Sequence, residues 1–446
     1  MGFAELWDSL LGIGQDAVTG GYRRYSFTET DAACREWFVK TAAERNLRTH
    51  SDRNANLWAW WDVGDEGIAD VVPAKPGQRR RPAVGRPWRG TGRWVGARGG
   101  VLGGRPPRAN TVVTGSHLDS VPDGGAYDGP LGIASAFAAI DQLRERGFVP
   151  ARPVAVAAFC EEEGGRFGLA CLGSRLLTGV TAPEAARELR DGDGVTLAEA
   201  MTGAGLDPAR LGADEELLAS IGSFVELHIE QGSALDGLGA AVGIAEGIWP
   251  HGRWRLDFTG QADHAGTTRL TDRRDPMLPY AATVLEARQA AAAYGALATF
   301  GKVTAEPGGA NAISSAVRAW LDARAPDQGV LDHMVGQIEA TARRAAQAQG
   351  VEVSMRRESF TPPVEFDPAL RARLAAALAG RGIAAPALPT GAGHDAGVLA
   401  ARVPTAMLFV RNPTGVSHSP AEHADLADCE AGVVALAAVL EELTSR

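Results

Sequence analysis

Histidine and carboxylate side chains recur along this 446-residue chain directly after apolar runs. His117 and Asp128 flank a polar, glycine-rich stretch that follows the apolar run Thr111–Thr114. The consecutive acids Glu161–Glu163 follow a second apolar run, and His228 lies at the end of a third. The later members of this set are Glu230, His394, Asp395 and His418. A mixed histidine and carboxylate set without paired cysteines suits Zn²⁺, Mn²⁺ or Co²⁺ rather than a thiolate metal site.

The apolar runs that precede these residues have the length and composition of buried strands. We expect strands at 111–115, 153–159, 223–229 and 403–410, with helices between them such as 130–147. This alternation predicts an α/β fold with a doubly wound, mostly parallel sheet. The carboxyl ends of parallel strands share one edge of the sheet, and ligands bind there. We therefore predict that the polar residues converge at that edge.

Residues 240–353 show a different pattern. The segments GRWRLDFTGQ and AVRAWLDAR alternate as half-buried strands do, and two long helical segments lie between and after them. This pattern predicts an inserted α+β domain of two layers, in which one face of the sheet is open. Residues 1–239 and 354–446 would then be the two parts of one catalytic domain.

A basic segment interrupts the first of these parts at about 72–110. It contains one lysine and nine arginines, is rich in proline and glycine, and has no acid. We interpret it as a solvated surface insertion between two strands, while an electrostatic patch for an anionic partner is the alternative. Charge alone does not separate the two.

Bulk composition excludes several classes of protein. The net charge of −10 argues against nucleic acid as the main partner, and no apolar run approaches the roughly 20 residues of a membrane span. The four cysteines are scattered and form no CxxC pair, as in proteins of a reducing compartment. Because the start of the sequence also lacks the pattern of a signal peptide, we expect a cytoplasmic protein.

Six motifs occur in order along nearly the whole chain. They are HLDSVPDGGAYDGPLG, EEEGGRFG, FVELHIEQG, ADHAGTT, GAGHDAG and GVSHSPAE. Together they resemble the M20 metallopeptidase/amidohydrolase family, over about residues 22–440. The resemblance is to the branch of N-carbamoyl-L-amino acid hydrolases, β-ureidopropionases and allantoate amidohydrolases.

This resemblance implies two divalent metal ions per subunit, with Zn²⁺ as the first choice and Mn²⁺ or Co²⁺ as alternatives. By their motifs, His117 and His228 match ligands of the first metal, and Glu163 and His418 match ligands of the second. Asp128 matches the carboxylate that bridges both metals.

The resemblance also implies catalytic and substrate-binding roles. Glu162 matches the general base, and Asp119 would support the ring of His117. His264 matches a histidine that stabilises the tetrahedral oxyanion and that usually comes from the partner subunit of a homodimer, through the inserted lid and dimerisation domain. Asn311 and Arg324 match residues that bind the substrate carboxylate.

Two further residues are weaker candidates for substrate binding. Gln231 follows the motif of His228 and is predicted to line the pocket. Arg411 either faces the substrate anion or caps a strand, and the sequence leaves both alternatives open.

The implied activity is metal-dependent hydrolysis of the ureido C–N bond of a small carboxylate, which releases CO₂ and ammonia. The candidate substrates are allantoate and N-carbamoyl-L-amino acids, and the segments EGIWPHGRWR and FVRNPTGVSHSP favour allantoate by resemblance. An aminopeptidase or dipeptidase on the same metals is one alternative. A non-catalytic binding protein on the same fold is the other.

Overall fold

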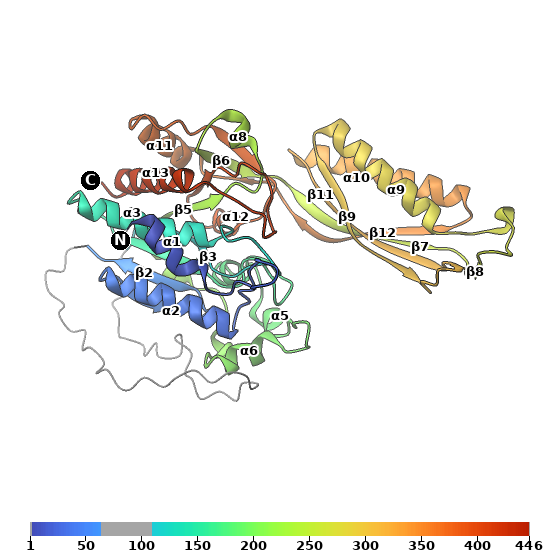
Figure 1. Cartoon of the computed structure of the whole chain (residues 1–446), viewed down its shortest axis with the longest axis horizontal. Helices are drawn as coiled ribbons and strands as arrows, with labels where there is room; N and C mark the ends of the chain where they lie inside the picture. Colours follow the sequence, from blue (N-terminus) through green and yellow to red (C-terminus); the bar gives the residue numbers. More distant parts are fainter. Residues whose placement is uncertain (1, 64–108, 446) are drawn as a thin grey trace. The chain divides into compact units, whose positions relative to one another are not determined.

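The computed structural model describes residues 2–63 and 109–445, and these residues form two compact units (Figure 1). Unit 1 comprises Met1–Ala245, Phe366–Leu388 and His394–Arg446, and unit 2 comprises Glu246–Glu365 with Pro389–Gly393. Unit 2 is thus an insertion in unit 1, and it begins and ends later in the chain than the expected 240–353.

Unit 1 is built on a sheet in which the strands follow the order β1-β2-β4-β3-β5-β15-β6. The central strands β4, β3, β5 and β15 are parallel, while β2 and β6 pair with them in the antiparallel sense. The strand bounds are β1 Arg48–Ser51, β2 Leu57–Trp61, β3 Thr111–His117, β4 Val154–Phe159, β5 Ile221–Ile229, β6 Val242–Ile248 and β15 Thr405–Val410. The short strand β13 spans Val364–Glu365, and the short strand β14 spans Ala387–Thr390. This arrangement confirms the predicted α/β fold with a mostly parallel sheet.

Helices cover the central strands. Every residue of β3 and β4 is buried, as expected where both faces of a parallel sheet are covered. The longest helices of unit 1 are α2 (Glu29–Glu44), α3 (Pro130–Glu145) and α13 (Leu426–Thr444), and α3 packs against α13 and against β3 and β5. The shorter helices are α1 (Phe3–Leu11), α4 (Leu172–Leu177), α5 (Pro183–Arg187), α6 (Leu197–Gly203), η1 (Pro208–Arg210), α7 (Glu215–Ser220), α8 (Ala234–Leu238), α11 (Pro368–Ala379) and α12 (Asp395–Leu399). Among the described residues, no helix combines the length and the apolar character that a bilayer crossing requires.

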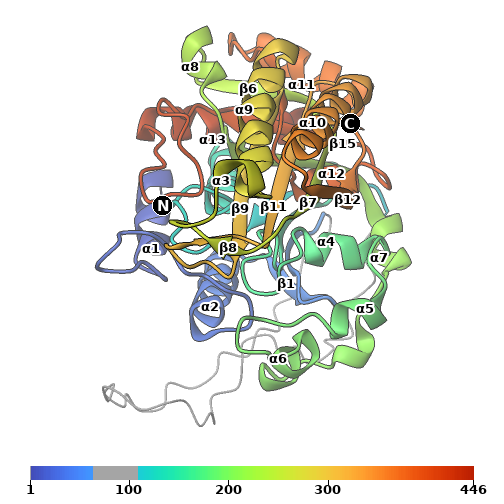
Figure 2. The same cartoon turned by 90° about the vertical axis from the view of Figure 1, so that its right-hand side faces the viewer.

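Unit 2 has an antiparallel sheet of four strands in the order β12-β7-β11-β9. The helices α9 and α10 lie side by side and supply the buried residues that pack on one face (Figure 2). The bounds are β7 His251–Thr259, β9 Leu297–Glu306, β11 Ala316–Arg324, β12 Glu352–Thr361, α9 Met277–Tyr294 and α10 Gln328–Ala348, with the small elements β8 Asp263–His264, η2 Leu270–Asp272 and β10 Ala312–Ile313.

The sequence predicted only two of these four strands. The strands β9 and β12 lie at the two edges of the sheet and bury few side chains, so that their apolar alternation is weak. The expected boundary at 353 falls inside β12, which continues the sheet of unit 2 to Thr361.

The predicted basic segment 72–110 lies outside the described residues except for its last two. Its flanking strands, however, are well defined. Trp61 at the end of β2 and Val112 at the start of β3 both pair with Val154, the first residue of β4. The segment therefore leaves and rejoins the sheet at the amino ends of β3 and β4, opposite the carboxyl ends of these strands.

Candidate active site

The carboxyl ends of β3 and β5 bring two histidines to one buried carboxylate. The Nε2 atoms of His117 and His228 lie 3.6 and 3.1 Å from Oδ1 of Asp128. Their Nδ1 atoms lie 3.1 and 2.9 Å from the backbone carbonyl oxygens of Asp119 and Ile229, which places the proton on Nδ1 and leaves Nε2 as a free electron-pair donor. Neither buried Nε2 atom has a hydrogen-bond partner in the described structure. These three side chains form one set of convergent donors.

A glycine makes the close approach of Asp128 possible. Gly129 has φ 87°, and a Cβ atom on it would lie 2.4 Å from the ring of His117. A larger residue would push the histidine or the aspartate out of place.

A second set of donors shares the same aspartate. Nε2 of His418 lies 3.4 Å from Oδ2 of Asp128 and 3.5 Å from Oε2 of Glu163. The other oxygen of Glu163, Oε1, is buried without a partner in the described structure. In each set the ligand atoms lie close enough together to hold a metal ion, and Asp128 belongs to both sets.

The electrostatics of the site fit divalent cations. Burial, reinforced by neighbouring carboxylates, raises the pKa values of Glu162 and Glu163 well above their usual range. Burial alone would also raise the pKa of Asp128, but the neighbouring rings of His117 and His228 hold it well below its usual range. So much buried negative charge is stable when cations accompany it. The residues present therefore fit a pair of divalent ions on nitrogen and oxygen ligands.

A tight turn after β4 presents the three glutamates. Glu161 has φ 55°, in the left-handed region, and its carboxylate accepts the amides of Arg166 and Phe167. The Asp119 carboxylate accepts the amides of Glu162 at 3.1 Å and of Glu163 at 3.0 Å. The turn therefore sets the side chains of Glu162 and Glu163 apart. The carboxylate of Asp119 holds this turn, while its carbonyl oxygen holds the ring of His117.

Glu162 lies beside the first donor set. Its Oε2 atom is 3.7 Å from Nε2 of His117, and its Oε1 atom accepts the thiol of Cys171 at 3.2 Å. The side chain is buried, with 5% of its surface exposed. Glu162 thus faces the same space as the predicted ligands without being a member of either donor set.

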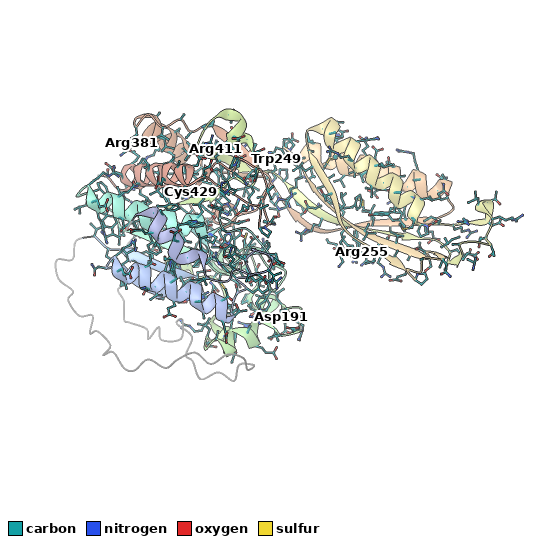
Figure 3. The ribbon with its side chains drawn as sticks, viewed as in Figure 1. Asp191, Trp249, Arg255, Arg381, Arg411 and Cys429 are labelled. Atoms are coloured by element: carbon teal, nitrogen blue, oxygen red, sulfur yellow. The ribbon has the colours of Figure 1, made fainter. Side chains whose placement is uncertain are left out.

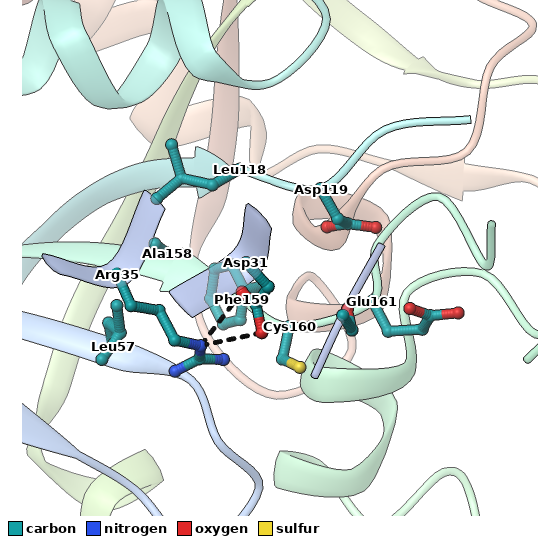
Figure 4. A pocket seen from close by; sticks show the side chains of 10 residues that line it. Asp31, Arg35, Leu57, Leu118, Asp119, Ala158, Phe159, Cys160 and Glu161 are labelled. Carbon is teal, nitrogen blue, oxygen red and sulfur yellow. Dashed lines mark hydrogen bonds and ion pairs between the residues drawn. The ribbon is translucent and has the colours of Figure 1, made fainter. Parts of the chain in front are cut away.

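A small cavity lies behind the glutamate turn (Figure 4). Its lining includes Asp119 and Glu161 from the site, together with Asp31 and Arg35 of α2, which form an ion pair at 3.1 Å. Neither the histidines nor Glu162 and Glu163 line it. The cavity therefore backs the turn and is separate from the donor sets.

One supporting residue in the motifs was given no role by the sequence analysis. The Glu422 carboxylate accepts the amides of Tyr127 and Asp128, both at 3.0 Å, and lies 3.3 Å from Oγ of Ser417. Burial raises the pKa of Glu422 to about 7. The sequence offered one signal for this role, which is the position of Glu422 four residues after His418 in the same motif. The backbone amides that Glu422 accepts, however, lie almost 300 residues away in the sequence.

The other polar residues at the strand ends differ in their surroundings. The Glu230 carboxylate accepts the first amides of α8, from Ala234 and Leu235. The ring of His394 lies 4.6 Å from that of His228, between centroids, and Asp395 accepts the hydroxyl of Ser174.

The two weaker candidates differ in position. Gln231 Nε2 lies 2.9 Å from Oδ2 of Asp128, directly at the donor sets. Arg411, labelled in Figure 3, binds the carboxylate of Asp428 through two nitrogens at 2.8 and 3.0 Å. The guanidinium of Arg411 therefore has an ion-pair partner in α13.

Within unit 2, His264 and Asn311 lie next to each other. His264 pairs with Ala312 between β8 and β10, and the amide of Ala265 donates to the carbonyl of Asn311 at 3.0 Å. Nδ1 of His264 accepts the amide of Gly266 at 3.0 Å, so its proton is on Nε2. This exposed side chain therefore presents an N–H donor to the solvent.

Arg324 lies elsewhere in unit 2. It is the last residue of β11 and pairs with His251 at the start of β7, whereas β8 follows the other end of β7 (Figure 1). Its Nε atom donates to Asp322 at 2.8 Å and its Nη1 atom donates to the carbonyl of Gly391 at 2.5 Å. The fold thus brings His264 together with Asn311 but keeps Arg324 apart from them.

Comparisons with known proteins identify relatives of the whole chain. The model of peptidase family M20/M25/M40 matches residues 113–442. The chain is 38% identical to an N-carbamoyl-L-amino acid amidohydrolase of Geobacillus stearothermophilus, over 97% of this chain and 96% of that protein. It is 35% identical to an allantoate amidohydrolase of Bacillus subtilis, over 77% of this chain and 84% of that protein. A crystal structure of a hydantoinase/carbamoylase family amidase from Burkholderia multivorans superposes with a TM-score of 0.80 and 28% identity, over 100% of this chain and 98% of that one.

Proposed function

This chain belongs to peptidase family M20/M25/M40, and on that premise we propose that it is an amidohydrolase acting on the ureido group of a small carboxylate. Allantoate and N-carbamoyl-L-amino acids are the proposed substrates, and CO₂ and ammonia are among the products. The observation that carries the proposal is the pair of donor sets that share Asp128.

The five side chains of these sets, His117, His228, Asp128, Glu163 and His418, would hold two divalent ions, Zn²⁺ in the first instance or Mn²⁺ or Co²⁺. When bound, such ions polarise the carbonyl of the substrate and lower the pKa of a water molecule. A ureido carbonyl is resonance-stabilised and reacts slowly without such help.

Glu162 is the proposed general base. It is buried next to the donor sets and has a carboxylate oxygen on their side, 3.7 Å from Nε2 of His117. It would take a proton from the attacking water and deliver it to the departing nitrogen.

The residues of unit 2 would complete the site. The Nε2–H donor of His264 suits the carbonyl oxygen as it gains negative charge, because a preorganised donor stabilises the transition state more than the ground state. Asn311 and Arg324 would bind the substrate carboxylate, with the guanidinium held in place by Asp322 and Gly391.

We also propose that the enzyme is a homodimer with shared sites. His264 and Arg324 lie at opposite ends of the nine-residue strand β7 and its neighbour β11. This length is about 27 Å for a strand, which exceeds the reach of a small substrate. Both residues would contact one substrate only if they came from two copies of the chain.

The test is ammonia release by purified protein loaded with Zn²⁺ or Mn²⁺. The panel comprises allantoate, several N-carbamoyl-L-amino acids, N-carbamoyl-β-alanine and a dipeptide. Release from one or more ureido acids is the expected result. Hydrolysis of the dipeptide alone would replace the proposal by a peptidase, and no hydrolysis at all with both ions bound would favour a binding protein.

A further inference from the structure

The segment that begins with Cys171 runs alongside the glutamate turn. The amides of Cys171, Leu172 and Gly173 donate to the carbonyl oxygens of Glu162 at 2.6 Å, Glu161 at 3.0 Å and Cys160 at 2.9 Å. These three consecutive bonds tie the backbone at the start of α4 to the backbone after β4. The side chain of Cys171 is therefore held at a fixed position relative to that of Glu162.

The thiol of Cys171 uses this position to contact the proposed base. Sγ lies 3.2 Å from Oε1 of Glu162, and both residues are buried. Burial raises the pKa of the Cys171 thiol well above its usual range, so the sulfur keeps its proton and donates it. The contact leaves Oε2, the oxygen nearer His117, free on the side of the donor sets.

We propose that Cys171 is a positioning residue that fixes the carboxylate of Glu162 with Oε2 directed at the donor sets. This inference rests on the proposed role of Glu162 as general base. The last torsion of a glutamate side chain has broad, roughly two-fold minima, so rotation about it is not restricted by the side chain itself. The hydrogen bond from the Cys171 thiol to Oε1 of Glu162 restricts this rotation.

The kinetic test compares Cys171→Ala with Cys171→Ser. The alanine variant should lose about three- to tenfold in kcat with little change in KM, since a thiol is a weak donor to a charged acceptor. The serine variant retains a hydroxyl donor and should recover part of this loss. Cys429→Ala is the matched control, because Cys429 (Figure 3) is equally buried but lies in α13 and should leave kcat unchanged.

A double-mutant cycle separates positioning from a general structural effect. In a Glu162→Gln background, Cys171→Ala should cause no further loss in kcat, because the carboxylate that it positions is gone. An equal loss in both backgrounds would overturn the inference. If Glu162→Gln itself kept wild-type turnover, the proposed base would fail, and that failure would be seen independently of Cys171.

Infrared spectroscopy of the S–H stretch gives a readout that needs no activity. The difference spectrum of wild type minus Cys171→Ala isolates one thiol among the four in the chain. Its band should lie at lower frequency than the bands of the other three, and Glu162→Gln should move it. A band at the frequency of the others, unmoved by Glu162→Gln, would overturn the inference even if the kinetic variants folded poorly.

Discussion

His264 and Arg324 occupy opposite ends of the sheet of unit 2, separated by the length of the paired strands β7 and β11. Mixed dimers of His264→Ala and Arg324→Ala should therefore regain one intact site per heterodimer. With random pairing on co-expression, we expect roughly a quarter of wild-type activity. Two different affinity tags and sequential purification would isolate the mixed dimer.

The adjacency of His264 and Asn311 provides the control for that experiment. Because both residues lie at the same end of unit 2, they would be contributed by the same copy. Co-expression of His264→Ala with Asn311→Ala should restore nothing. Two outcomes would contradict the sharing of sites. One is recovery of activity in this control, and the other is an isolated heterodimer of His264→Ala and Arg324→Ala that has no activity.

Glu162→Gln should retain both ions and the fold but lose on the order of 10² or more in kcat, as expected when a general base is removed. Metal content by elemental analysis and kcat on the best ureido acid are the two measurements. Glu161→Gln is a matched control in the same turn, since its side chain faces the amides of Arg166 and Phe167. Near-wild-type turnover of Glu162→Gln would remove Glu162 from the mechanism.

Binding of metal to the metal-free protein should release protons. The pKa of Glu163 is raised well above its usual range by burial and by the charge of Asp128, so the group holds a proton that a cation must displace. Affinity should accordingly increase with pH, and calorimetry in buffers of different ionisation enthalpy would count the protons. Glu163→Gln should release fewer protons and weaken one of the two binding events. Proton release equal to that of the wild type would contradict the assignment.

Glu422 should make the metal-free protein less stable as the pH rises. Its folded pKa is raised from 4.5 to about 7, mainly by burial, so the folded state binds this proton more tightly than the unfolded state does. The stabilising contribution is complete below pH 4.5 and is lost as the pH rises through 7. Denaturant midpoints at several pH values should fall less over this window in Glu422→Gln than in the wild type. The exposed Glu430→Gln should leave the profile unchanged.

The sequence predicted the central sheet because its strands carry strong local signals. Buried parallel strands such as β3 and β4 are continuous apolar runs, and each ligand follows one of them or lies within an ordered motif. The edge strands β9 and β12 gave no such signal, because an open-faced sheet buries little of them.

The backbone contacts of the supporting residues could not be predicted in the same way. The roles of Asp119 and Glu422 come from hydrogen bonds to backbone amides in distant segments, 43 to 295 residues away. A carboxylate that accepts backbone amides needs no particular residue type at the other end of the bond. Such roles therefore become visible only when the fold places the segments together.

Because Trp61 and Val112 both pair with Val154, the two ends of the chain between them lie close together. The two junctions are separated by the width of two strand spacings, about 10 Å, which a few residues of linker can span. Deleting about 75–106 should leave turnover unchanged, as measured against the full chain. The same junctions should accept a reporter domain whose own termini lie close together. The protein could then be labelled at the edge of the sheet that is farthest from the candidate active site.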